Sequence, residues 1–181
     1  QGIQYCFLCG GIDDVLYAAR PYFLRLAGLL NNLVGSTDTL SSPFLKPNNR
    51  AGKVLCVITS DSGLCGLYNN NVLRSAEEFI RLNGKGTVKL VCIGRKGFNY
   101  FKRRDVEILQ SYLGANGRYS QAVAGQIRDF LSDLFLTGKT GEVHILYTYF
   151  GGGLSHKPMR EKFMPFDLGR GREIDYILEP D

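Results

Sequence analysis

The chain has 181 residues, of which 44% are hydrophobic and 22% charged, and its formal net charge is +5. This length and balance suit one folded domain with its own core and argue against extensive disorder. No apolar run approaches the roughly 18 residues that a spanning helix needs, so we expect no membrane span. The five cysteines are odd in number and fit a reducing, cytosolic setting better than a disulfide framework.

The first fifty residues differ in character from the rest. Gln1 opens the chain without an initiator methionine or a basic region before the apolar residues, so we expect a fragment without a signal peptide. Residues 20–34 carry apolar side chains at near-helical spacing, and Pro21 suits a first helical turn. Residues 35–49 are rich in Ser, Thr, Pro and Asn, which is typical of a linker. We therefore expect a helix and a linker over residues 20–50.

From Lys53 onward, strand-like and helix-like segments alternate. Apolar, β-branched runs predict buried strands at residues 54–59, 87–93, 106–112 and 142–149. Apolar side chains at spacings of three and four predict helices over residues 72–80, 96–103 and 123–134. Alternation of this kind indicates parallel strand pairing with right-handed crossovers. The expected fold class is α/β, a three-layer Rossmann-like sandwich with a mainly parallel sheet and helices on both faces.

The pattern changes after Tyr149. Three consecutive glycines at 151–153 predict a flexible corner. The mixed segment Pro158–Phe166 follows and is expected to return as an edge strand.

The turn at residues 59–66 follows the first strand, where sheets of this class usually bind ligands. A dinucleotide fingerprint needs glycines spaced G-x-G-x-x-G, but Asp61 takes the first of these positions when Gly63 and Gly66 supply the others. A carboxylate there would repel a pyrophosphate, which favours a structural turn. A small nucleotide-binding or enzymatic module that uses the Asp61–Gly66 turn remains the alternative.

Other signals of chemistry are weak. The tripeptide Gly138–Thr140 resembles the end of a P-loop, but it leaves a helix and enters a strand, and its leading glycine is missing. Cys65 lies near a helix start, yet no histidine can be placed beside it. Cys6 and Cys9 form a single CxxC without further ligands for zinc. We therefore expect no catalytic, cofactor or metal site.

The segment Lys96–Arg104 interleaves basic and aromatic residues. Such a pattern can bind single-stranded nucleic acid through phosphate contacts and base stacking. The simpler interpretation is a helix with a solvated basic face and buried aromatic side chains. We favour that interpretation and expect no nucleic-acid partner.

Several segments together resemble one known family. Residues 57–66 read VITSDSGLCG and are followed by Asn69–Asn71, which closely resembles the T-S-D-R-G-L-C-G-G-x-N segment of F-type ATP synthase gamma subunits. Three further matches fall in the same order along the chain: Arg20–Tyr22, Ile93–Gly97, and Asp175–Tyr176 with Glu179–Asp181. The resemblance covers most of the chain from Arg20 to Asp181.

This resemblance implies a domain plan and a function. It divides the chain into a divergent remnant of the N-terminal segment at 1–19, the helix and linker at 20–50, and a Rossmann-like domain at 51–181. It implies a central-stalk subunit that performs no catalysis itself. Such a subunit transmits torque between the proton-driven c-ring and the catalytic alpha/beta hexamer, and contacts epsilon. Its implied place is peripheral, at the cytoplasmic face of a bacterial plasma membrane or its organellar equivalent.

The resemblance also implies where partners bind. The expected interface residues belong to the turn and the start of the next helix: Asp61, Ser62, Leu64, Cys65, Asn69 and Asn71. Ser62 stands where the family carries an arginine that would face an acidic loop of a beta subunit, so that contact is expected to be weaker here. Leu67 replaces a family glycine, and the turn is expected to pack more tightly.

Overall fold

The computed structural model describes residues 43–48, 50, 52–62, 67–114, 121–150 and 156–166. These residues belong to one compact unit, Ser42–Asp167. Its elements in the described part are β1 (Lys53–Ile58), α2 (Leu67–Asn83), β2 (Val88–Ile93), α3 (Arg95–Phe101), β3 (Ile108–Tyr112), α4 (Gln121–Leu136), β4 (Glu142–Phe150) and β5 (His156–Met164). The helix expected at residues 20–34 lies outside the described residues.

The five strands form one sheet in the order β3-β2-β1-β4-β5. β1 pairs in parallel with β2 and β4, and β2 pairs in parallel with β3. Only β5 runs antiparallel, alongside β4. The α/β fold with a mainly parallel sheet is therefore confirmed. Each predicted strand is present, with its ends shifted by up to two residues.

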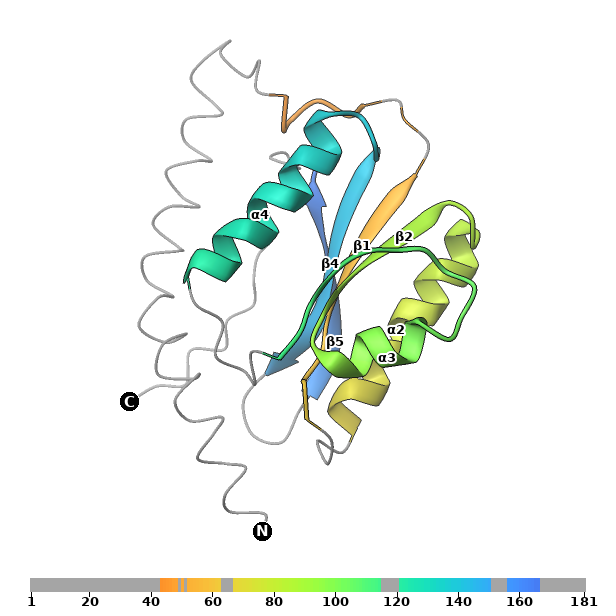
Figure 1. The fold of residues 1–181 in the computed structure, drawn as a ribbon. Coiled ribbons are helices and arrows are strands. Elements are labelled where there is room, and N and C mark those ends of the chain that lie inside the picture. Colours follow the sequence, from red (N-terminus) through yellow and green to blue (C-terminus); the bar gives the residue numbers. More distant parts are fainter. Residues whose placement is uncertain are drawn as a thin grey trace, which may run out of the picture. The chain divides into compact units, whose positions relative to one another are not determined.

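The direction of chain travel explains why helices cover both faces. β1, β2 and β3 follow one another outward, and then the chain returns past β1 to form β4. Because crossovers between parallel strands are right-handed, this reversal puts α4 on the face opposite α2 and α3. Figure 1 shows α4 on one side of the sheet and the other two helices across it. The result is the expected three-layer sandwich.

Alternate residues of the central strands belong to two hydrophobic clusters, one on each face of the sheet. Leu55 and Val57 of β1 pack with α2 and α3, while Val54 and Cys56 pack with α4. All four are at most 1% exposed. A strand buried on both faces has no polar side to show in its sequence, which is why β1 reads as a continuous apolar run.

Among the helices that the structure describes, α2 contributes the most buried apolar side chains to the core. Its side chains Val72, Leu73, Ala76, Phe79 and Ile80 are all at most 6% exposed, as their spacing predicts. Burying a large apolar side chain contributes about 1.5–3 kcal/mol relative to leaving it in water. Packing on the sheet therefore explains why this segment is helical.

The antiparallel edge strand β5 confirms the expected return of the chain after Tyr149. Pro158 lies opposite Thr148 and has no backbone N–H to offer a further strand. Charged side chains at Lys157, Arg160 and Lys162 also discourage pairing of this edge with another sheet.

Among the described residues, no helix is both long and apolar enough to cross a membrane. The predicted domain limits at residues 19 and 50 stay a prediction.

Replacing Leu90 by Ala tests the core between the sheet and α2. Leu90 is fully buried, so we expect the free energy of unfolding to fall by about 2–5 kcal/mol. Leu82, on the outer face of α2, is 66% exposed, and Leu82→Ala is the matched control with an expected change within about 0.5 kcal/mol. Urea denaturation of both variants measures the difference. Equal losses would contradict the described packing.

Candidate partner interface

The turn that follows β1 lies at the carboxyl edge of the parallel sheet. Thr59, Ser60, Asp61 and Ser62 are described, whereas Leu64 and Cys65 lie outside the described residues. Thr59 is 4% exposed, and Ser62 lies at the surface. The structure therefore places the first half of the predicted interface at the edge where ligand sites of this fold class occur.

Thr59 joins the end of β1 to the start of α3. Its hydroxyl donates to the carbonyl of Ile93 at 3.1 Å and accepts the N–H of Gly97 at 2.9 Å. Gly94 has φ +90°, and a side chain there would drive its Cβ into the Thr59 carbonyl oxygen. Gly94 is thus required by its close approach to the Thr59 backbone, whereas a Cβ at Gly97 would crowd the Thr59 side chain, with Oγ1 at 3.1 Å.

Asp61 links three strand ends through one oxygen. Its Oδ1 accepts the backbone N–H of Arg95 at 3.0 Å and that of Gly114 at 2.9 Å. Arg95 opens α3 after β2, and Gly114 follows β3. A carboxylate that accepts backbone N–H groups forms strong, charge-assisted hydrogen bonds. Asp61 therefore ties the carboxyl ends of β1, β2 and β3 together.

Asn69, in the first turns of α2, holds the same turn from its other side. Its Oδ1 accepts the N–H of Ser60 at 3.0 Å, and its Nδ2 donates to Ser60 Oγ at 2.8 Å. Asn69 is 8% exposed, and Asn71 is half-buried. Among the predicted interface residues described here, Asp61 and Asn69 shape the turn, and Ser62 is the one at the surface.

This geometry does not favour the nucleotide-binding alternative. A phosphate needs backbone N–H groups at the turn or helix start. Here the N–H groups of Arg95 and Gly114 already bind the Asp61 carboxylate, and that of Ser60 binds Asn69. These three N–H groups are therefore engaged within the protein, whereas residues 63–66 of the turn lie outside the described residues.

The other sequence signals resolve into structural roles. The N–H groups of Gly138 and Lys139 bond to the carbonyls of Phe135 and Leu134, so the Gly138–Thr140 segment ends α4 as a turn. In the segment Lys96–Arg104, Phe101 is buried and Phe98 and Tyr100 pack against the core. Lys96 is exposed, as a solvated basic face requires.

The described thiols are unsuited to catalysis. Cys56 and Cys92 are reduced and buried. Burial raises the pKa of each to about 12, so both stay protonated and unreactive near neutral pH. No group of three potential metal ligands occurs among the residues that the structure describes.

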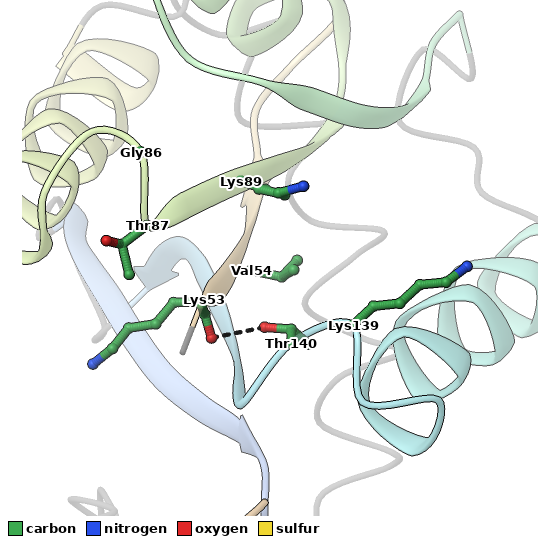
Figure 2. Close-up of a pocket in the computed structure, with 8 residues that line it drawn as sticks. Lys53, Val54, Gly86, Thr87, Lys89, Lys139 and Thr140 are labelled. Carbon is green, nitrogen blue, oxygen red and sulfur yellow. Dashed lines mark hydrogen bonds between the residues drawn. The ribbon is translucent and has the colours of Figure 1, made fainter. Parts of the chain in front are cut away.

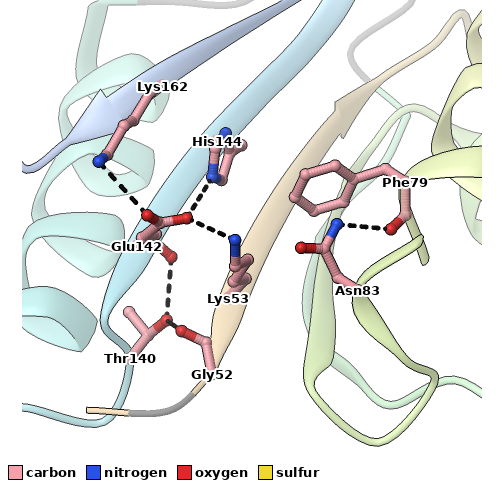
Figure 3. Close-up of polar contacts among 8 residues, drawn as sticks. All are labelled: Gly52, Lys53, Phe79, Asn83, Thr140, Glu142, His144 and Lys162. Atoms are coloured by element: carbon pink, nitrogen blue, oxygen red, sulfur yellow. Dashed lines mark hydrogen bonds and ion pairs between the residues drawn. The ribbon is translucent and has the colours of Figure 1, made fainter. Parts of the chain in front are cut away.

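A polar cluster that sequence reasoning missed lies at the opposite, amino edge of the sheet. Glu142 binds Lys53 at 2.9 Å, His144 at 3.0 Å and Lys162 at 3.3 Å (Figure 3). The ring of His144 also packs on Phe79, with centroids 4.9 Å apart. Glu142 and His144 are two apart in a strand, so they share a face. That spacing is the signal that could have revealed the pair.

The pKa values of Glu142 and His144 are both lowered, but for different reasons. Burial opposes ionisation of Glu142, but hydrogen bonds from His144 and Lys53 and the charges of Lys162 and Lys53 lower its pKa to about 2. Burial lowers the pKa of His144, and the charges of Arg160 and Lys53 add to this, although Glu142 opposes it. A neutral imidazole therefore donates to a charged carboxylate at neutral pH.

Removal of the Asp61 carboxylate tests its role in the turn. Asp61→Ala removes the acceptor of two N–H groups at a partly exposed position where water replaces it in part, so we expect a loss of about 1–2 kcal/mol in unfolding free energy. Asp61→Asn keeps an acceptor oxygen and should lose about half as much. Denaturant unfolding gives the energies, and hydrogen exchange at Arg95 and Gly114 locates them. Unchanged exchange in Asp61→Ala would contradict the assignment.

The Glu142 cluster predicts destabilisation by acid. Both folded pKa values lie below their unfolded counterparts, so the unfolded chain binds more protons. Stability should fall from about pH 6.5 as the unfolded chain takes up the His144 proton, and fall further from pH 4.5 toward 2 through Glu142. Glu142→Gln should lower the free energy of unfolding at pH 7 by about 1–2 kcal/mol, a figure reduced because Glu142 is partly exposed. The variant should also lose the pH dependence of stability below about pH 4.5. Urea midpoints between pH 7 and 3 measure this, and an unchanged slope below pH 4.5 would contradict it.

Comparison with known proteins identifies the family of this chain. The family described as ATP synthase matches residues 11–181. The ATP synthase gamma chain of Chloroherpeton thalassium is 31% identical, over 93% of this chain and 62% of its own length. That of Prosthecochloris aestuarii is 36% identical, over 90% of this chain and 59% of its own. The chain thus spans about 60% of the length of these relatives.

A solved structure shares the fold. A chain in the Tetrahymena thermophila mitochondrial ATP synthase central stalk and c-ring structure matches with a TM-score of 0.56 and 17% identity. The match covers 82% of this chain and 71% of the Tetrahymena chain. Since the family match covers nearly the whole chain, the protein belongs to the ATP synthase family, and the curated relatives that it resembles are gamma chains.

Proposed function

We propose that the chain belongs to the gamma subunit of an F-type ATP synthase and works in its central stalk. There it transmits torque between the proton-driven c-ring and the alpha/beta hexamer, and it performs no catalysis itself. The proposal rests on the family match over residues 11–181 together with gamma-chain relatives. Its partners would be the alpha, beta and epsilon subunits and the c-ring, with no nucleic acid.

A structural observation is consistent with the proposal: the Asp61 junction, by which we mean the hydrogen bonds from the N–H groups of Arg95 and Gly114 to Asp61 Oδ1. A part that transmits torque must resist deformation where force enters it. The carboxylate of Asp61 joins the ends of three strands, and Thr59 fixes α3 to the same edge. Packed interiors transmit strain because they are dense and only slightly compressible. This edge therefore suits a mechanical contact better than a mobile ligand loop.

Ser62 is the position at which a partner contact can be tuned. It is exposed beside the Asp61 junction, so its side chain can face another subunit. Where the family carries an arginine, a serine supplies no charge to an acidic partner. We infer that this turn contacts the hexamer through shape and neutral hydrogen bonds, with less dependence on salt.

The place of the protein follows from this role. A subunit of the stalk is peripheral to the membrane, at the cytoplasmic face of a bacterial plasma membrane or at its organellar equivalent. The chain itself has no described helix that could span the bilayer.

Purification of the tagged natural gene product from its host tests the proposal. We expect alpha, beta and epsilon subunits to co-purify, with ATP hydrolysis in the recovered complex. A matched purification of the Asp61→Ala variant should recover less complex, because the junction is lost. Recovery of no synthase subunit, or of a bound nucleotide or nucleic acid instead, would contradict the proposal.

A further inference from the structure

A hollow of about 170 Å³ opens at the amino edge of the sheet (Figure 2). It lies between the starts of β1 and β2 and the loop that leads into β4. Three lysines line it, Lys53, Lys89 and Lys139, and no acidic side chain does. We call it the basic hollow. It is at the opposite end of the strands from the Asp61 junction, so it is separate from the interface described above.

Of the three lysines, Lys89 and Lys139 are the two whose ammonium groups could bind an anion in the basic hollow. Lys53 points away from it in Figure 2 and pairs with Glu142 at 2.9 Å. Lys89 pairs with Glu107 at 3.0 Å, but these side chains are 43% and 59% exposed. An exposed pair of this kind is weak and exchanges readily. None of the ion pairs between described residues involves Lys139, which is exposed.

The floor of the basic hollow is held by hydrogen bonds. The hydroxyl of Thr140, a residue that is 2% exposed, lies within hydrogen-bond distance of the Gly52 carbonyl at 3.0 Å and the Glu142 carbonyl at 2.9 Å. The N–H of Gly141 binds the Gly52 carbonyl at 2.9 Å. Asn48 donates to the Thr140 carbonyl at 2.9 Å. The backbone that carries Lys139 is therefore held in place, while its side chain is exposed.

Size limits what the basic hollow can receive. Sites for small organic molecules usually measure about 300–1,000 Å³, so a nucleotide does not fit. One carboxylate or phosphate group does. Lysine ammonium groups bind such oxyanions as point charges.

The surrounding charge favours a chain of acidic groups over a single ion. Arg50 lies beside Gly138, where an added Cβ would meet its Nε at 3.6 Å. Lys85 is exposed in the turn that leads into β2. Two further cations, Arg50 and Lys85, thus belong to the segments that carry the lining residues Gly52 and Gly86. We propose that the basic hollow binds an acidic segment of a protein partner, with one carboxylate seated between Lys89 and Lys139.

Fluorescence anisotropy with a dye-labelled glutamate-rich peptide and the full chain tests this proposal. We expect saturable binding that weakens with added salt, and no binding of the matched glutamine-rich peptide. Lys139→Gln should weaken binding about two- to fivefold, and Lys139→Arg should restore it. Glu107→Gln releases Lys89 and should strengthen binding about twofold.

The matched control is Lys102→Gln, which removes the same charge from an exposed lysine beyond the end of α3. It should leave the affinity unchanged. Equal weakening in Lys102→Gln and Lys139→Gln would show attraction to bulk charge and overturn the proposal. Inorganic phosphate that binds with the same dependence on Lys139 and displaces the peptide would also overturn it, in favour of a free anion. Each of these outcomes leaves the proposed stalk function untouched, because the purification above does not depend on the basic hollow.

Discussion

The carboxyl edge of the sheet depends on the hydrogen bonds that the Asp61 carboxylate accepts from the loops after β2 and β3. Parallel strands end side by side at this edge, and the loops that leave them carry backbone N–H groups in need of acceptors. One oxygen of Asp61 serves two of these groups, at Arg95 and Gly114. An acidic residue at this turn is therefore explained by the needs of the fold before any partner is considered.

The close approach of Thr59 to Gly94 and Gly97 makes the Asp61 arrangement possible. Because a Cβ at Gly94 would collide with the Thr59 backbone, the segment Ile93–Gly97 and the turn after β1 constrain each other. Two motifs that lie more than thirty residues apart are thus one structural unit. Their shared presence in the sequence reflects a single contact between two loops.

The two edges of the sheet differ in electrostatic character. At the carboxyl edge, the polar side chains of Asp61, Asn69 and Thr59 form hydrogen bonds with backbone groups of the same edge. The amino edge keeps its cations at the surface, where Glu142 and Glu107 balance only some of them. Under the proposed stalk function, the hydrogen-bonded carboxyl edge would carry force and the charged amino edge would recognise a partner.

The sequence by itself determined the class of fold and the order of its elements, because strands buried on both faces and amphipathic helices leave strong periodic patterns. Lys53–Ile58 and the apolar stripe of α2 were predictable in this way, and so was the edge strand after Tyr149. The contact of Asp61 with Arg95 and Gly114 and the pairing of Glu142 with Lys53 and Lys162 join residues far apart in the chain. Only the tertiary structure decided these, since strand order and register set which side chains meet, and no local pattern encodes them.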